Sequence, residues 1–159
     1  MITTIEDLHE HLQWAIELEH ATIPPYLCAL YSIKDGSNIE SVEVIQSVFI
    51  EEMLHMALVA NIMIATGGSP KLDYPEFIAK YPTPLPHSDE SFQVDLNKFS
   101  PESIECFLKI ERPANADAPS QDEGFASIGQ FYKALEEGLV YLSQKLGDKV
   151  LFTGNPDHQ

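Results

Sequence analysis

Apolar residues recur every three or four positions in four segments of the chain, which is the period of an amphipathic helix. We expect helices from Thr3–Thr4 to about residue 33, from Ser37–Asn38 to Gly67, and over 100–112 and 127–147. Residues 69–100 contain five prolines and no sustained helical period, so they predict a long loop of the kind that often covers a functional site. The pattern favours an all-α bundle with long Pro-rich connections, built as one domain over residues 1–159.

Local signals refine the ends of these helices. Capping-box spacing places the first N-terminus at Thr3 with Glu6 and the second at Ser37 with Glu40. Pro24–Pro25 removes two amide donors and predicts a break or kink in the first helix. Ser100 is expected to cap the third helix and Ser127 with Gln130 the fourth, the third ending at Arg112-Pro113 and the fourth at Gly147. Residues 92–96 alternate and predict a short extended piece, whereas the tail 152–159 predicts no helix.

Several acids fall inside the apolar stripes rather than on the polar faces. At about 100° per residue, Glu19 lies between Ile16 and Ile23, while Glu17 points to the solvated side. Glu52 lies in the middle of the second stripe, with His55 one turn further along the same side. Glu111 continues the stripe of the third helix, and Glu136 lies at the margin of the fourth. These positions predict carboxylates in the interior of the bundle.

Buried carboxylates must be protonated, paired with a basic side chain or bound to a cation. No Lys or Arg falls on the stripes beside these acids, so a pair of metal ions is the simplest way to neutralise them. Carboxylate-bridged di-iron bundles use one Glu from each of two helices and Glu-x-x-His from each of the other two, and Glu52–His55 has this spacing. Glutamate and imidazole ligands suit iron or manganese, with zinc acceptable.

A single Glu-x-x-His motif on a helix is weak evidence, since a core histidine beside a paired acid has the same spacing. The hypothesis depends on Glu19, Glu52, His55 and a further acid, for which Glu111 and Glu136 both remain open. The other histidines are interpreted as packing or surface residues: His9 and His20 as half-buried, His11, His87 and His158 as exposed or in loops. Tyr26 and Tyr132 are expected in the core, where they can line a cavity near the acids.

Charge and cysteine content narrow the range of functions. Nine basic and 25 acidic residues give a formal net charge of −16, which disfavours binding to nucleic acid or to an anionic membrane surface. The two cysteines lack metal-type spacing and fit a reducing compartment, so we expect a cytoplasmic protein. The N-terminus lacks the pattern of a signal peptide, and the apolar stretch 56–65 is shorter than a membrane span.

Four strings carry a family resemblance: ELEHATIPPYL (17–27), EEMLHMALVANIMIATGGSP (51–70), IERP (110–113) and SIGQFYKALEEGL (127–139). They resemble the ferritin-like domain of iminophenylpyruvate dimer synthases, which act in violacein and indolocarbazole pathways, and the similarity covers nearly the whole chain. The resemblance implies a ferritin-like bundle in which Glu19, Glu52 and His55 occupy metal-ligand positions. It also implies a cytoplasmic non-haem di-iron oxidoreductase that acts on a small organic molecule with O₂.

The chain departs from that family in one respect. Similar proteins continue past NPDHQ into another helix with further acidic and histidine residues, so the second Glu-x-x-His is missing here. Three explanations are open for the missing motif. The protein is a truncated member, its bundle is completed by a homo-oligomer or a larger biosynthetic enzyme, or its site is degenerate. The alternatives to an oxidoreductase are an iron-binding or storage protein and a catalytically silent helical partner domain.

Overall fold

The structure is a computed structural model that describes residues 1–158. Its helices are α1 (Ile5–Ser32), α2 (Ile39–Ala65), α3 (Pro101–Ile110), α4 (Ile128–Leu146) and α5 (Asp148–Leu151), with 3₁₀ turns η1 (Pro75–Phe77) and η2 (Pro156–His158). Extended pairing in the described residues is limited to two isolated bridges, one of which joins Val94 to Thr83. The all-α prediction is therefore confirmed.

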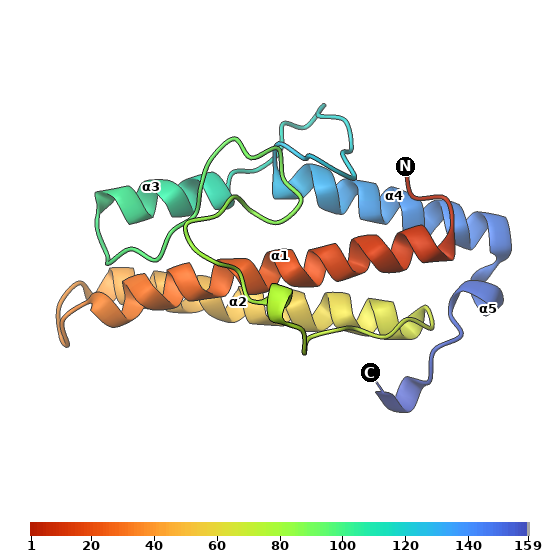
Figure 1. Ribbon diagram of the computed structural model, residues 1–159, viewed down its shortest axis with the longest axis horizontal. Coiled ribbons are helices and arrows are strands. Elements are labelled where there is room, and N and C mark those ends of the chain that lie inside the picture. The colour runs from red at the N-terminus through yellow and green to blue at the C-terminus, as the bar shows by residue number, and fades with distance from the viewer. Residues whose placement is uncertain (159) are drawn as a thin grey trace.

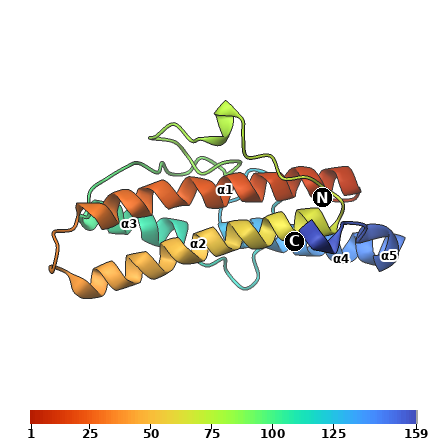
Figure 2. The same ribbon diagram turned by 90° about the horizontal axis from the view of Figure 1, so that it is seen from below.

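The helices form a bundle with three columns (Figure 1). α1 and α2 make a long antiparallel hairpin, and α3 and α4 follow one another along the other side of α1. Figure 2 shows the loop after α2 crossing α1 on the face that looks away from α2. Glu52 of α2 and Tyr132 of α4 thus approach α1 from different sides, which places the candidate ligands where the columns meet.

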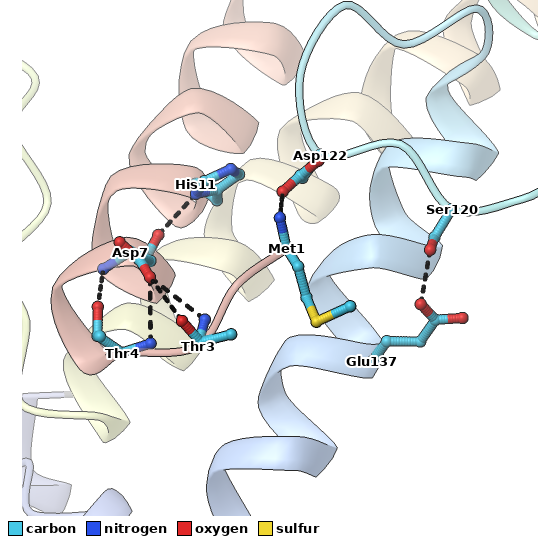
Figure 3. Close-up of polar contacts among 8 residues, drawn as sticks. All are labelled: Met1, Thr3, Thr4, Asp7, His11, Ser120, Asp122 and Glu137. Atoms are coloured by element: carbon cyan, nitrogen blue, oxygen red, sulfur yellow. Dashed lines mark hydrogen bonds and ion pairs between the residues drawn. The ribbon is translucent and has the colours of Figure 1, made fainter.

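The N-terminus of α1 is held by a capping box one residue later than predicted. Thr4 is the N-cap, its hydroxyl accepts from the Asp7 amide at 3.0 Å, and the Asp7 carboxylate accepts from the Thr4 amide (Figure 3). The predicted Thr3–Glu6 pair is wrong because Asp7, one position further along, turns back to the amides of both threonines. The Met1 amino group contacts Asp122, which ties the loop 113–126 to the start of the chain.

Pro24–Pro25 does not break α1, so the break is wrong in the prediction of a break or kink. The helix continues to Ser32, and Pro25 is fully inside it and buried. Proline at position 25 leaves the Ala21 carbonyl without its amide donor. The Tyr81 hydroxyl donates to that carbonyl at 2.6 Å. A side chain from the Pro-rich loop therefore replaces the missing backbone hydrogen bond and keeps α1 continuous.

The ends of α2 and α3 also differ from the predictions. Asn38 is the N-cap of α2 in the left-handed conformation, with no side-chain cap, so the expected Ser37–Glu40 box is absent. Ser100 caps α3 as expected and forms its capping box with Ser103. α3 ends at Ile110, two residues before the predicted end, so Glu111 is the C-cap residue.

The end of the chain is more regular than expected. α4 ends at Leu146 with Gly147 at positive φ, as predicted. The short helix α5 follows at residues for which no helix was predicted, and η2 lies in the tail 152–159 that was predicted to lack helix. Gly154 passes so close to the end of α2 that a Cβ there would lie 1.7 Å from the Ile64 carbonyl oxygen. Its amide donates to the Ala65 carbonyl at 3.0 Å. The tail therefore closes the C-terminus of α2.

The core lies between α1 and α4, whereas α2 is largely open. Leu8, Leu12 and Ile16 of α1 pack with Phe131 and Leu142 of α4, all almost completely buried. α2 is long and apolar enough to cross a membrane by length and composition alone, with mean hydropathy 1.6 over 18 residues, of which 17% are buried. The apolar segment is thus longer than the 56–65 stretch considered in the sequence. Helices of soluble bundles meet the same criterion, and α2 packs along α1.

Candidate metal centre

Three of the predicted ligands meet at the centre of the α1–α2 hairpin. His55 Nδ1 lies 3.5 Å from Glu19 Oε2 and 3.9 Å from Glu52 Oε1. One ligand atom from each of the three side chains falls within 4.8 Å of the others. Two ligand atoms that each lie about 2.1 Å from one metal ion are at most about 4.2 Å apart, so the two distances from His55 Nδ1 are compatible with one coordination sphere. The helical periodicity thus placed Glu19, Glu52 and His55 together correctly.

Two hydroxyl groups orient the buried carboxylates. The Thr22 hydroxyl donates to Glu52 Oε2 at 2.8 Å, and the Tyr132 hydroxyl of α4 donates to Glu19 Oε1. Thr22 is one turn beyond Glu19 on the same face of α1, a spacing that is readable from the sequence but was not singled out. Each carboxylate keeps its other oxygen toward His55. Such outer-shell hydrogen bonds fix the direction in which ligands face a metal.

Both carboxylates are buried without a Lys or Arg partner in the described residues. Glu19 is 3% and Glu52 5% exposed, and no Lys or Arg forms an ion pair with either in the described part of the chain. Burial raises the pKa of Glu19, and burial together with the adjacent Glu19 carboxylate raises the pKa of Glu52 to about 8. The pair therefore holds a proton when no cation is present. A bound cation would take the place of that proton.

Of the two acids left open, the structure brings Glu111 and not Glu136 to this site. Glu111 Oε1 accepts from the Tyr26 hydroxyl at 2.5 Å and lines the same cavity as Glu19 and Glu52. Both acids are exposed, so the prediction of interior carboxylates is wrong for Glu111 and Glu136, and Glu136 lines a neighbouring cavity instead. Burial, followed by the charge of Glu111, raises the pKa of Tyr26, which therefore stays a neutral donor. Whether either acid binds a metal remains a prediction.

The centre opens into an apolar cavity of 390 Å³ between α2, the end of α3 and the start of α4. Leu58, Ile62, Ile110 and Ile128 form its walls. The loop 69–100 contributes none of the residues that line this cavity, so the prediction that it covers the mouth is wrong. It folds over the other side of α1, where Tyr81 and Tyr74 contact the helix.

Arg112 lies at the rim of the cavity and was not identified from the sequence. It is the only arginine in the chain and follows Glu111 directly. Within residues 1–158 its side chain forms no ion pair or hydrogen bond. A free guanidinium at the edge of an apolar cavity is suited to bind a carboxylate or phosphate.

A second polar cluster lies on the opposite side of α1, and the sequence analysis missed it. Glu17 was expected to be solvated, but its carboxylate accepts from Tyr74 at 2.5 Å and lies 3.0 Å from His87 Nε2. The His87 ring stacks on Trp14 with centroids 4.2 Å apart. These contacts fasten the Pro-rich loop to α1. His9 and His20 are half-buried packing residues, as interpreted: His9 contacts Thr66, and His20 packs on Phe77.

Comparison with protein families identifies the class of the chain. The Ferritin-like family model matches residues 12–159, so the protein belongs to the ferritin-like family. Neither the comparison with curated proteins nor that with solved structures gives a match. The chain is thus a ferritin-like helical protein with a candidate site of two glutamates and one histidine for a metal ion.

Proposed function

We propose that this protein binds a pair of iron ions and acts as an oxidoreductase on a small, apolar organic anion. The observation that carries the metal part is the buried pair Glu19–Glu52, which faces His55 and has no Lys or Arg partner in residues 1–158. The donor set fits the metal, because carboxylate oxygens and one imidazole suit iron or manganese. Glu19, Glu52 and His55 would hold one ion, and Glu111 would contribute to holding the other.

The side chains around the centre have defined tasks in this proposal. Tyr132 and Thr22 keep the two carboxylates oriented toward His55. Glu52 must release its proton before it binds a metal, because its pKa is raised to about 8. The apolar walls keep water away from the reacting atoms. When bound, reduced iron supplies the electrons for reaction with O₂.

The cavity favours an organic substrate over iron storage. Its walls are mainly aliphatic, and Arg112 at the rim supplies a positive charge in a chain of net charge −16. An aromatic or aliphatic acid would place its apolar body against Ile62 and Ile128 and its carboxylate at Arg112. This agrees with the resemblance to the iminophenylpyruvate dimer synthases, and the assignment to that group is part of the proposal. We also propose that the protein is cytoplasmic.

Anaerobic reconstitution with iron followed by elemental analysis tests the metal site. We expect at least one equivalent of iron per chain, rising toward about two at saturation. The Glu52→Ala, His55→Ala double variant should retain less than about a tenth of this amount, because both ligands of the motif are removed. The exposed neighbour Glu51 gives the control Glu51→Ala, which should bind normally. Wild-type protein below about 0.1 equivalent would contradict the proposal.

Binding of 3-phenylpropanoate to the iron-loaded protein, measured by calorimetry, tests the substrate class. Arg112→Gln should weaken binding by about 10-fold at unchanged iron content, because it removes the guanidinium at the rim. Lys109→Gln, a change of the same charge one turn earlier on α3, is the matched control. Equal affinities of wild type and Arg112→Gln would exclude the role of Arg112. O₂ uptake by the reduced protein that is independent of any added acid would favour storage.

A further inference from the structure

The outward face of α2 carries apolar side chains that nothing covers in the described residues. Leu54 and Leu58 are 53% and 50% exposed, and Ile50 and Ile62 flank them. From Met53 to Ala65 the helix has no charged residue, although the chain as a whole is strongly acidic. An exposed apolar surface of this kind on a soluble domain marks a contact site.

The spacing along this face is that of a helix that pairs with another helix. Six positions follow one another at intervals of four and three residues, which is the seam of a coiled coil. Five of the six are exposed and Ala65 is half-buried. In order, the seam contains Ser47, Glu51, Leu54, Leu58, Asn61 and Ala65.

This seam is complementary to itself when it is read in the opposite direction. If two copies of α2 pack antiparallel about a two-fold axis beside Met56, Leu54 of each meets Leu58 of the other. Glu51 then faces Asn61, and Ser47 faces Ala65. The contacts pair apolar with apolar, carboxylate with amide donor, and small with small. A two-fold interface requires such self-complementarity, because the same surface serves both partners.

Charge favours the same arrangement. All four acids of α2, at positions 40, 43, 51 and 52, lie in its N-terminal two-thirds, and the helix has no Lys or Arg. Antiparallel packing places the acidic end of each helix beyond the uncharged end of the other, and also opposes the two helix dipoles. A parallel pair would bring Glu51 against Glu51 instead. The uncharged half of α2 is thus suited to contact between two chains of net charge −16.

We propose that the protein is a homodimer in which the two α2 helices pack antiparallel through Leu54 and Leu58. Leu58 belongs both to this seam and to the wall of the cavity. Ile62, another residue of that wall, lies next to the seam. A second copy therefore narrows the opening through which water reaches His55. The dimer depends on α2 alone and forms with or without a metal ion.

Sedimentation velocity of the full chain in EDTA tests the dimer independently of metal binding. We expect twice the chain mass of 17.8 kDa. Leu54→Glu, at an exposed position outside the cavity lining, should raise the dissociation constant of the dimer by at least about 100-fold. Leu108→Glu on α3, where the side chain is 66% exposed, is the control and should remain dimeric. A monomeric wild-type protein would overturn the proposal, and so would a Leu54→Glu variant that remains dimeric. If the monomer also floats with phosphatidylcholine vesicles, the apolar face of α2 binds a membrane instead of a second copy.

A charge exchange tests the antiparallel pairing without removing an apolar side chain. Asn61→Glu should weaken the dimer about 10-fold, because it places a carboxylate against Glu51 of the other copy twice per dimer. Adding Glu51→Lys should restore the affinity to within about threefold of wild type. Failure of this rescue, with both variants folded by circular dichroism, would overturn the antiparallel seam.

Discussion

Glu17 and Glu19 are two residues apart on α1 and lie in opposite electrostatic environments. Burial alone raises the pKa of Glu17, but hydrogen bonds from His87 and Tyr74 outweigh it and leave the pKa below its ordinary value. Burial raises the pKa of Glu19 and outweighs the hydrogen bond from Tyr132, and no Lys or Arg forms an ion pair with this carboxylate in the described chain. A carboxylate whose hydrogen bonds outweigh the cost of burial stabilises the fold, whereas a pair for which burial outweighs them destabilises it unless a cation binds. This contrast separates a structural contact from a candidate metal site.

The largest difference between changes at Glu17 and at Glu19 is expected in metal binding. Glu19→Gln should lower the affinity for Fe²⁺ by at least about 100-fold, because it removes a charged ligand from the centre. Glu17→Gln, the same change on the same helix, should bind like wild type. Anaerobic titration followed by calorimetry measures both. Equal losses in the two variants would mean that general acidity, rather than the Glu19–Glu52–His55 arrangement, attracts the ion.

A smaller effect is expected in the stability of the metal-free protein. The pKa of Glu52 is about 8 in the fold against an ordinary value of 4.5, so the native state holds a proton that the unfolded state has released between these values. The stability of the wild type relative to Glu52→Gln should therefore fall as pH rises through this range. We expect a change of about 2 kcal/mol between about pH 5.5 and 7.5.

Urea denaturation in EDTA at several pH values provides this measurement. Glu51→Gln controls for the loss of one charge from the same helix. Parallel stability curves for wild type and Glu52→Gln would contradict a protonated carboxylate in the interior.

The smallest effect is expected on the other side of α1. His87→Ala removes a donor to Glu17 and the ring stacked on Trp14, which should cost about 1 kcal/mol and make residues 69–100 more sensitive to proteolysis. His11→Ala is the control, because His11 also packs on Trp14 but does not contact Glu17. The contribution of ionised Glu17 is present above its ordinary pKa of 4.5 and is lost as pH falls through its lowered value. The difference in the free energy of unfolding between wild type and His87→Ala should therefore shrink in acid. If it does not shrink, stacking on Trp14 alone accounts for it.

Sequence periodicity was sufficient for the part of the site that lies within one helix hairpin. The 3.6-residue repeat places Glu19 and Glu52 inward and His55 one turn on, and these three do meet. It did not distinguish Glu111 from Glu136, because that choice depends on α3 ending at Ile110 and on the position of Tyr26. The metal-ligand roles themselves are still predictions.

Contacts between distant segments account for the other differences. Glu17 was placed on the solvated face of α1, which is its correct side, but the loop that covers this face begins more than 50 residues later. The same loop supplies Tyr81 to α1, so the effect of Pro24–Pro25 was not readable from local propensity. The loop was expected over the cavity, yet its tyrosines bind the opposite face.

The hydrogen bond from Tyr81 to the Ala21 carbonyl makes α1 and the Pro-rich loop inseparable as building blocks. An α1–α2 hairpin grafted alone into another scaffold would retain an unsatisfied carbonyl at Ala21, two residues from Glu19. Any redesign that shortens the loop while keeping the site must therefore install a new donor at this point of the helix, or replace Pro25 with a residue that has its own amide hydrogen.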